Sequence, residues 1–189
     1  VDCCQAGVHV MCEKPMALAL PDCDRMIAAA SEAGVKLMIG QSTRYSAPLL
    51  EIKRIFESGR CGDLVCAWST RMGYHNCRPE ALWRLDGDKS GGIVFEWEVH
   101  EIDFVCSIGG RVSQVYAQTA YSRPDAPNFL DHFSAILTFA NQGYGNLEAS
   151  QSCTLGQSGR GFIGARGAAQ SEGADGVRVK TLDMEQAEL

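Results

Sequence analysis

Residues 8–15 read Val-His-Val-Met-Cys-Glu-Lys-Pro, an apolar run that ends in the charged tripeptide Glu13-Lys14-Pro15. A short apolar run of this kind is typical of a buried strand in a parallel sheet. A lysine at the end of such a strand is costly unless it meets solvent or a polar or anionic ligand. Lys14 is therefore either a ligand-binding residue in a crevice or an ordinary charged strand end. Pro15 restricts the peptide bond before it, which can be cis.

The neighbouring sequence completes one crossover unit. Residues 21–33 carry apolar side chains at helical spacing, with a proline in the first turn and Gly34 as a left-handed stop. Residues 35–39 form a second short apolar run, so strand, helix and strand make the βαβ unit of a doubly wound sheet. Residues 1–7 resemble the last turn of a preceding helix. We therefore expect residues 1–40 to be the C-terminal remnant of an α/β domain, in a chain that begins within that domain.

The pattern changes after Gly40 and predicts a second domain over residues 41–189, which we expect to be incomplete at its C-terminus. A helix follows Ser46, residues 64–72 alternate with period two, and residues 93–108 carry apolar side chains at helical spacing. Further strands are expected at 111–121, 128–140, 144–153, 160–165 and 175–181. The expected fold class is α/β plus α+β: a remnant parallel sheet, then a C-terminal α/β domain with a mostly antiparallel open sheet and helices on one face.

The composition argues against several classes of function. A net charge of −6 without any run of Lys and Arg cannot neutralise a phosphate backbone, so nucleic acid is not an expected partner. No apolar stretch approaches the roughly 20 residues that span a bilayer, and no signal segment is visible, so we expect a cytoplasmic protein without membrane contact. The nine cysteines include no C-x-x-C pair, which predicts reduced, mostly buried thiols and no metal site.

One helical constellation can carry chemistry. Glu96, His100 and Asp103 stand at i, i+4 and i+7, which places them on one side of the predicted helix. A carboxylate one turn from a histidine can fix its tautomer and basicity, as a general base that acts on an alcohol requires. A solvated ion pair on the helix surface explains the same spacing. The apolar residues that flank this face favour the catalytic interpretation.

Polar and aromatic residues after the predicted strands supply further candidates. These candidates are Arg44 and Tyr45, Arg71, Tyr74 and His75, and Trp83 and Arg84. Trp83 offers an apolar face to a small ligand, and Arg71, Arg84 or Tyr74 can donate hydrogen bonds to it. By contrast, His9 and His132 lie within strand patterns and are expected to have structural or surface roles. Gly164 and Gly167 fit a turn better than a phosphate loop, because no strand-to-helix transition accompanies them.

Taken together, a series of motifs resembles the Gfo/Idh/MocA oxidoreductases. The motifs are His9-Val10-Met11-Cys12-Glu13-Lys14-Pro15, Arg44-Tyr45, Glu57-Ser58-Gly59-Arg60-Cys61-Gly62, Trp83-Arg84-Leu85-Asp86, Ser90-Gly91-Gly92 and His100-Glu101-Ile102-Asp103. Their order and spacing match throughout, and no single motif would suffice. The resemblance covers nearly the whole chain, which corresponds to roughly the middle half of a full-length member.

The resemblance implies a Rossmann domain that binds NAD or NADP, followed by an α/β domain whose open sheet builds homodimers or homotetramers. It implies that Lys14 holds the substrate hydroxyl and touches the nicotinamide ribose, while His100 takes the hydroxyl proton. Glu96, the third implied catalytic residue, stands where the family usually has Asp. The implied cofactor-binding residues are Glu13, Lys14, Pro15 and Arg44. The implied substrate-binding residues are Tyr74, Trp83, Arg84 and Asp103.

The chain also departs from the family. Glu98 stands where a small residue is common, and Ile93 replaces a frequent third glycine. We find no G-x-G-x-x-G loop after a strand to cradle the pyrophosphate, so we expect the cofactor-binding segment to be missing and the isolated chain to be inactive. The expected function is oxidation of a CH–OH group of a sugar, inositol or related polyol by NAD(P). The alternatives are a non-catalytic relative that senses a nucleotide or sugar, and a degenerate remnant that folds poorly.

Overall fold

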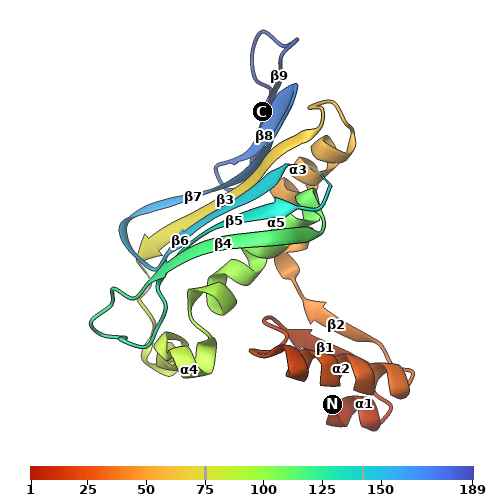
Figure 1. Ribbon diagram of the computed structural model, residues 1–189, viewed down its shortest axis with the longest axis vertical. Helices are drawn as coiled ribbons and strands as arrows, with labels where there is room; N and C mark the ends of the chain where they lie inside the picture. The colour runs from red at the N-terminus through yellow and green to blue at the C-terminus, as the bar shows by residue number, and fades with distance from the viewer. Residues whose placement is uncertain (75, 142) are drawn as a thin grey trace. The chain divides into compact units, whose positions relative to one another are not determined.

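The structure is a computed structural model that describes residues 1–74, 76–141 and 143–189. The chain divides into two compact units, Val1–Ser42 and Thr43–Leu189, each of which is described here by itself. Figure 1 labels the helices and strands of both units.

The first unit is a single βαβ crossover with a short helix before it. Its elements are α1 (Asp2–Gln5), β1 (Val10–Glu13), α2 (Leu20–Glu32) and β2 (Leu37–Gly40). The two strands pair in parallel, with Glu13 opposite Gly40 at their carboxyl ends (Figure 1). Cys4, Ala29 and Ala30 form the small core, against which the aliphatic residues of the strands pack. The predicted crossover is therefore confirmed, and the bond between Lys14 and Pro15 is cis.

The second unit is a seven-stranded sheet with helices packed against it. Its helical elements are η1 (Ser42–Tyr45), α3 (Ala47–Glu57), η2 (Pro79–Leu85), α4 (Gly87–Ser90), the π-helical turn η3 (Val94–Glu98) and α5 (Val99–Gly109). Its strands are β3 (Leu64–Tyr74), β4 (Val112–Ala120), β5 (His132–Phe139), β6 (Tyr144–Ser150), β7 (Ser152–Gly164), β8 (Gly167–Glu172) and β9 (Gly176–Thr181). The strand order is β4-β5-β6-β3-β7-β8-β9, in which β3 and β6 are parallel and the other pairs antiparallel. The mostly antiparallel open sheet is confirmed.

Helices α3 and α5 cover one face of this sheet (Figure 1). Ile52 of α3 and Val105 of α5 are fully buried, and they belong to one apolar core with Leu147 and Phe162 of the sheet. A side chain at Gly145 would place its Cβ 2.6 Å from Val105, closer than Cβ atoms approach. Helix α5 therefore lies directly against the backbone of β6.

The sheet differs from the prediction between residues 144 and 172. β6 ends at Ser150, and β7 runs from Ser152 to Gly164, although residues 154–159 were not predicted to be strand. Glycine and polar residues hide the strand signal there, and β3 pairs with residues 157–159 of this stretch, which stabilises them as strand. Strand β8 was not predicted, but the turn between Gly164 and Gly167 is confirmed.

The glycine spacing G-x-G-x-x-G does occur in the chain, at Gly159-Arg160-Gly161-Phe162-Ile163-Gly164. It lies inside β7 and is not a strand-to-helix turn, so it has no helix N-terminus to bind a pyrophosphate. A Cβ at Gly161 would lie 2.5 Å from the carbonyl oxygen of Ala169, and one at Gly164 would lie 2.3 Å from that of Cys61. These glycines therefore permit close packing within the sheet.

The prediction that the cysteines are reduced and mostly buried was partly wrong. All nine cysteines are free, but only Cys4, Cys61 and Cys66 are buried, and Cys3 is exposed. The other five lie at intermediate depth. Burial raises the pKa of the Cys61 and Cys66 thiols.

A buried carboxylate joins α5 to the sheet. Glu101 is fully buried and accepts hydrogen bonds from Ser69 Oγ of β3 at 2.8 Å and from Arg160 Nη2 of β7 at 2.5 Å. Arg160 Nε also donates to it, and Arg71 Nη1 lies 3.4 Å away. Burial by itself would raise the pKa of Glu101, but Arg160, Ser69 and Arg71 outweigh it and the pKa is lowered. Glu101 is therefore an ionised anchor.

Glu98 lies one turn earlier on the same buried side. It is fully buried, and neither carboxylate oxygen has a hydrogen-bond partner among the described residues. Burial, together with the charge of Glu101, raises the pKa of Glu98 to about 8. Glu98 is therefore a neutral acid at pH 7.

The raised pKa of Glu98 predicts that the free energy of unfolding falls as the pH rises. Its folded pKa of about 8 lies above the ordinary value of 4.5, so its contribution is complete below about pH 4.5 and is lost as the pH rises towards 8. Glu98→Gln should remove this loss, which amounts to at most about 1.4 kcal/mol per pH unit in the free energy of unfolding. Urea denaturation at pH 5, 6, 7 and 8 would measure it, with tryptophan fluorescence as the signal.

All three tryptophans of the chain, Trp68, Trp83 and Trp97, lie in the second unit, so the signal reports on the part that contains Glu98. Glu80→Gln, at an exposed position, is the matched control and should follow the parent chain. Parallel pH curves for the parent and Glu98→Gln would show that Glu98 is ionised in the folded state.

Candidate active site

The polar side of helix α5 faces short segments of the second unit, while Glu98 and Glu101 face the sheet. His100 and Asp103, one turn apart, both contact η1, through Thr43 and Arg44 respectively. Glu96 belongs to the π-helical turn before α5 and contacts η2. The three residues that the sequence predicted on one side of a helix are thus the ones that reach these segments.

The imidazole of His100 is held by a hydroxyl. His100 Nδ1 lies 3.1 Å from Thr43 Oγ1, and both side chains are half-buried. Which atom donates depends on the tautomer of the histidine. Thr43 is absent from the sequence prediction, since a threonine between two polar residues gives no periodic or motif signal.

Asp103 binds Arg44 in a bidentate pair. Arg44 Nε donates to Asp103 Oδ2 at 2.6 Å, and Nη2 donates to Oδ1 at 2.7 Å. The hydrogen bond and the charge of Asp103 raise the pKa of Arg44. The side chain of Asp103 is only 15% exposed, so its charge requires this partner. The sequence assigned Arg44 to cofactor and Asp103 to substrate, whereas the structure joins the two in one ion pair.

Glu96 forms a second ion pair, with Arg84. Arg84 Nη1 donates to Glu96 Oε1 at 2.9 Å, and the carboxylate is 8% exposed. The Arg84 guanidinium also lies 5.6 Å from the ring centroid of Trp83. The predicted residues Trp83, Arg84 and Glu96 therefore form one group, in which half-exposed Trp83 offers its ring to solvent.

Tyr74 ends β3 and is covered by an arginine that the sequence analysis missed. The guanidinium of Arg123 lies 4.9 Å from the Tyr74 ring centroid, and its side chain is 3% exposed. Arg123 also binds Asp125 at 2.6 Å. Its loop position gives no sequence signal, because only tertiary contact brings it to β3. His75, the other candidate here, lies outside the described residues.

The loop that carries Arg123 is fixed by a buried aspartate. Asp131 is fully buried and accepts hydrogen bonds from Ser122 N at 2.7 Å and Ser122 Oγ at 2.6 Å, and from Ser152 Oγ. Burial would raise the pKa of Asp131, but these donors outweigh it and the pKa is lowered. Residues 128–131 were expected to be strand; they form this anchored loop instead, and β5 begins at His132.

Glu13, Lys14 and Pro15 lie in the first unit at the carboxyl end of β1. Glu13 Oε2 accepts a hydrogen bond from Lys14 N at 3.3 Å. Gly40 stands at the same end of the neighbouring strand, where a Cβ would lie 3.4 Å from Glu13 Oε2. The carboxyl ends of parallel strands are the side on which open α/β sheets bind their ligands, so these residues fit a nucleotide cofactor. His9, also in this unit, accepts a hydrogen bond at Nδ1 from Lys36 N at 3.1 Å, which is a structural role.

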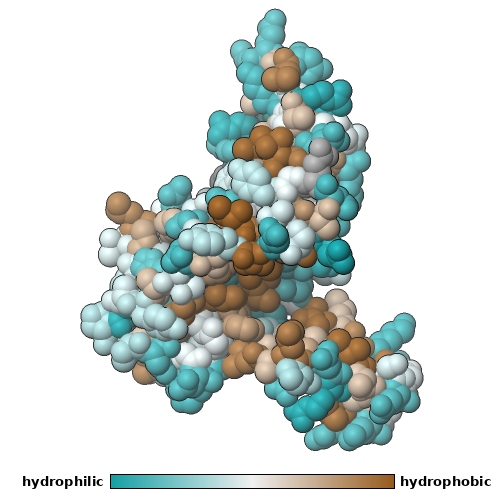
Figure 2. Space-filling model, in the orientation of Figure 1, coloured by the Kyte–Doolittle hydropathy of each residue, from teal (hydrophilic) through white to brown (hydrophobic). Residues whose placement is uncertain are grey.

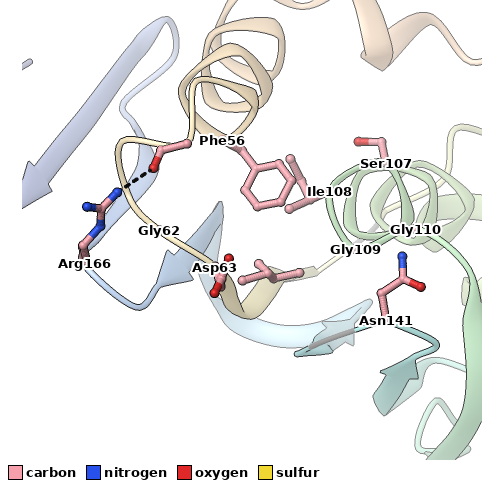
Figure 3. Close-up of a pocket in the computed structure, with 11 residues that line it drawn as sticks. Phe56, Gly62, Asp63, Ser107, Ile108, Gly109, Gly110, Asn141 and Arg166 are labelled. Carbon is pink, nitrogen blue, oxygen red and sulfur yellow. Dashed lines mark hydrogen bonds between the residues drawn. The ribbon is translucent and has the colours of Figure 1, made fainter.

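Cavities of very different size lie near the two ends of α5. A cavity of about 560 Å³ lies beside its C-terminal end, lined by Ser107, Ile108, Gly109, Gly110, Asp63 and Arg166 among others (Figure 3). This cavity contains none of the predicted site residues. A cavity of about 20 Å³ lies beside His100, with Thr43, Arg44 and Asp103 in its wall. Cavity volume therefore does not identify the site, and the chemistry of the side chains does.

In residues 1–74, 76–141 and 143–189, no three or more His, Cys, Asp or Glu side chains are arranged to hold a metal ion. No helix in that part of the chain is long and apolar enough to cross a membrane.

Comparison with known families identifies the chain. Residues 49–170 match the family described as GFO/IDH/MocA C-terminal domain. Residues 1–41 match the family described as oxidoreductase family, NAD-binding Rossmann fold. The chain therefore belongs to the Gfo/Idh/MocA oxidoreductases, as the sequence motifs suggested.

Three relatives illustrate the similarity. The 1-carboxy-3-chloro-3,4-dihydroxycyclo hexa-1,5-diene dehydrogenase of Comamonas testosteroni is 35% identical over 147 residues, which are 77% of this chain and 36% of that protein. The scyllo-inositol 2-dehydrogenase (NADP(+)) of Bacillus subtilis is 30% identical over 149 residues, 78% of this chain and 39% of that protein. The crystal structure of aldose-aldose oxidoreductase from Caulobacter crescentus, complexed with glycerol, has a TM-score of 0.85 at 26% identity and covers 99% of this chain and 57% of that one.

The chain spans only part of each relative. The matched regions make up between 30% and 53% of the length of the curated relatives. The activity, the substrate and the choice of nicotinamide are therefore matters for a proposal.

The Arg44–Asp103 pair predicts a measurable coupling between η1 and α5. Because Arg44 is 57% exposed and screened by solvent, a double-mutant cycle of Arg44→Gln and Asp103→Asn should give roughly 0.5–1 kcal/mol by urea denaturation. The Glu51–Arg54 pair on α3 is the control, since it has similar geometry but is exposed at both ends and should show a weaker coupling. Equal couplings in the two cycles would mean that the Arg44–Asp103 pair does not hold η1 to α5.

Proposed function

We propose that the protein containing this chain transfers hydride between a CH–OH group of a sugar, inositol or related polyol and NAD or NADP. The observation that supports the proposal is the polar side of α5, where His100 is held by a hydroxyl while Glu96 and Asp103 each bind an arginine. An imidazole between two carboxylates that are each paired with an arginine suits a general base for an uncharged alcohol.

His100 and Lys14 have separate roles in this proposal. Lys14 donates a hydrogen bond to the substrate hydroxyl oxygen and stabilises negative charge there. His100 accepts the hydroxyl proton, so the O–H bond breaks, a C=O bond forms and the hydride leaves the same carbon. An oxidised nicotinamide held by Glu13, Lys14 and Pro15 would supply the acceptor for that hydride, and His100 would later return its proton to solvent.

Glu96 and four other residues of the second unit are proposed to bind the rest of the substrate. The Glu96 carboxylate can accept a hydrogen bond from a sugar hydroxyl while Arg84 donates to a neighbouring one. The ring of Trp83, next to Arg84, can cover the apolar face of a sugar. Tyr74 supplies a further hydroxyl from the end of β3, and Asp103 contributes through its pair with Arg44.

The cofactor is proposed to meet Glu13, Lys14 and Pro15 in the first unit, with Arg44 as a further contact. The support is their place at the carboxyl ends of two parallel strands, together with the family match to an NAD-binding Rossmann fold. One relative is named as an NADP(+) enzyme, and a solved neighbour of similar fold contains NAD+, so both nicotinamides belong in the assay. We also propose that the protein works in the cytoplasm.

A second candidate function is a non-catalytic relative that senses a nucleotide or a sugar. Retention of both Lys14 and His100 argues against it, because a binding module requires neither a base nor a matched lysine. The same assay separates the two functions, since a sensor binds cofactor or sugar without turnover.

The variant His100→Ala tests whether His100 is the general base. Reduced nicotinamide formation should be followed against a panel of sugars and inositols, in the 189-residue chain and in the longest polypeptide encoded in frame with it. We expect His100→Ala to lower kcat by about 10²- to 10⁴-fold, the usual contribution of a general base, with cofactor binding unchanged. His132→Ala, on β5 and 40% exposed, is the matched control and should retain parental activity.

Two outcomes would count against the dehydrogenase. If the longest polypeptide binds nicotinamide but oxidises nothing on the panel, the sensor is the better account. If His100→Ala is as active as the parent, another group takes the proton.

The uncovered face of the sheet is proposed to bind a second copy of this chain. Ser69 and Gly145 point to the helices, so Trp68 and Tyr144, which precede them in the sequence, point to the opposite face. Tyr116 and Ile136 are paired on that face, and they are 65% and 48% exposed. Figure 2 shows hydrophobic side chains among hydrophilic ones on the surface of this unit. Apolar side chains of this kind are typical of an interface, so we propose a homodimer or homotetramer.

Ile136→Asp should weaken this association. A charge at the centre of an apolar interface is costly, so the mass measured by light scattering should fall towards that of one chain. Leu182→Asp places the same charge at an 84% exposed residue after β9 and should leave the mass unchanged. A parent chain that is already monomeric at micromolar concentration, or an Ile136→Asp chain that remains associated, would contradict this interface.

A further inference from the structure

Arg71 of β3 has a guanidinium edge that the described part of the chain does not use. Its Nη1 lies 3.4 Å from the carbonyl oxygen of Trp97 and 3.4 Å from Glu101 Oε1, and both contacts are long. Its Nε and Nη2 make no hydrogen bond to residues 1–74, 76–141 or 143–189. These two nitrogens form one two-donor edge of the guanidinium, so Arg71 can bind an oxyanion with two parallel hydrogen bonds.

Stacking on a tryptophan holds this guanidinium in place. Its carbon lies 4.4 Å from the ring centroid of Trp97, which belongs to the π-helical turn η3. Trp97 packs in turn against the apolar cluster that contains Leu85 and Phe129. An arginine stacked in this way keeps its in-plane donors available, because the ring covers only its flat face. The side chain of Arg71 is 31% exposed, so a ligand can reach it.

The positive charge of Arg71 is not balanced by the acids around it. The charged groups that act on buried Glu98 are Glu101 of α5, Arg71 of β3 and Arg160 of β7. Burial, together with the charge of Glu101, raises the pKa of Glu98 to about 8, so this acid is neutral at pH 7. The ionised Glu101 is bound by Arg160 through Nε and Nη2. Two arginines therefore face one carboxylate, and the charge that remains suits an anion.

Arg71 and its tryptophan lie next to the candidate active site. Trp97 follows Glu96 directly and precedes His100 by three residues, and residues three apart are neighbours on the surface of a helix. One ligand of the size of a sugar can therefore present a hydroxyl to His100 and a second group to Arg71.

We propose that Arg71 binds a carboxylate of the substrate, so that sugar acids or polyol acids are preferred to their uncharged counterparts. This proposal rests on the proposed function only in that the ligand is the substrate; the anion site itself is a property of the second unit. The two oxygens of a carboxylate match the two-donor edge of an arginine. Because stacking has already oriented the guanidinium, little conformational entropy is lost when the ligand binds.

Titration of the 189-residue chain at pH 7 tests the site without turnover, with tryptophan fluorescence as the signal because Trp97 stacks on Arg71. The probes are glucuronate and gluconate, the uncharged glucose and sorbitol, and a glucose phosphate. We expect the two acids to bind at least about tenfold more tightly than the uncharged probes. Arg71→Gln should weaken binding of the acids by about 10- to 100-fold and that of the uncharged probes by less than about threefold. Arg178→Gln, which removes a half-exposed arginine of β9, is the control and should match the parent.

Several results would overturn the carboxylate site. These are equal affinities of the parent for acids and uncharged probes, tighter binding of the glucose phosphate than of either acid, and no binding by either the 189-residue chain or the longest polypeptide encoded in frame with it. If Arg71→Gln folds poorly, Arg71→Lys decides, because it keeps the positive charge beside Glu101 but loses the two-donor edge. Arg71→Lys should bind the acids less tightly than the parent, and parental affinity would contradict the proposal.

Kinetics in the longest polypeptide separate this proposal from the proposed function. Turnover of acids with a kcat/KM that Arg71→Gln lowers by about 10- to 100-fold would support both. Turnover of uncharged sugars that is unaffected by Arg71→Gln, without preference for acids, would overturn the Arg71 site and leave the dehydrogenase. Binding of acids that depends on Arg71 but leads to no turnover would support the site and favour the sensor.

Discussion

The buried carboxylate of Glu101 is the constraint on which the second unit depends. It is taken out of water on the inner face of α5 and compensated by Arg160 of β7 together with Ser69 of β3. An ionised group in this position tolerates little rotation of the helix, because any other register would leave the carboxylate without its donors. The same register points His100 and Asp103 away from the sheet. The chemistry on one side of α5 is thus fixed by a charge on the other side.

Each acidic residue on the polar side of α5 is also bound by an arginine from a neighbouring segment. Glu96 meets Arg84 of η2, and Asp103 meets Arg44 of η1. These pairs neutralise the carboxylates locally and tie two short segments to the helix. The polar side of α5 is therefore a surface of directed donors and acceptors with little net charge, which favours recognition of a ligand by hydrogen-bond geometry over recognition by charge.

Local patterns predicted the elements whose stability is local or strongly apolar. The βαβ crossover, α3 and the run that becomes α5 followed from spacing, prolines and glycines, and His100 and Glu96 followed from helical spacing. Residues 154–159 of β7 did not, because this stretch has little strand propensity of its own and pairing with β3 stabilises its second half. Thr43 was invisible for a related reason, since its partner is 57 residues away and only the tertiary fold brings the two together.

The close contact between Gly145 and Val105 also bears on how this molecule can diversify. With β6 lying directly under α5, a side chain at position 145 would conflict with Val105, and this close packing against the sheet makes the helix a platform. The segments over its polar side, such as η2 and the loop with Arg123, are attached by individual ion pairs and ring contacts that can be exchanged one at a time. Descendants of this scaffold would therefore acquire new substrates by rewriting those segments, while inheriting the platform and its histidine unchanged.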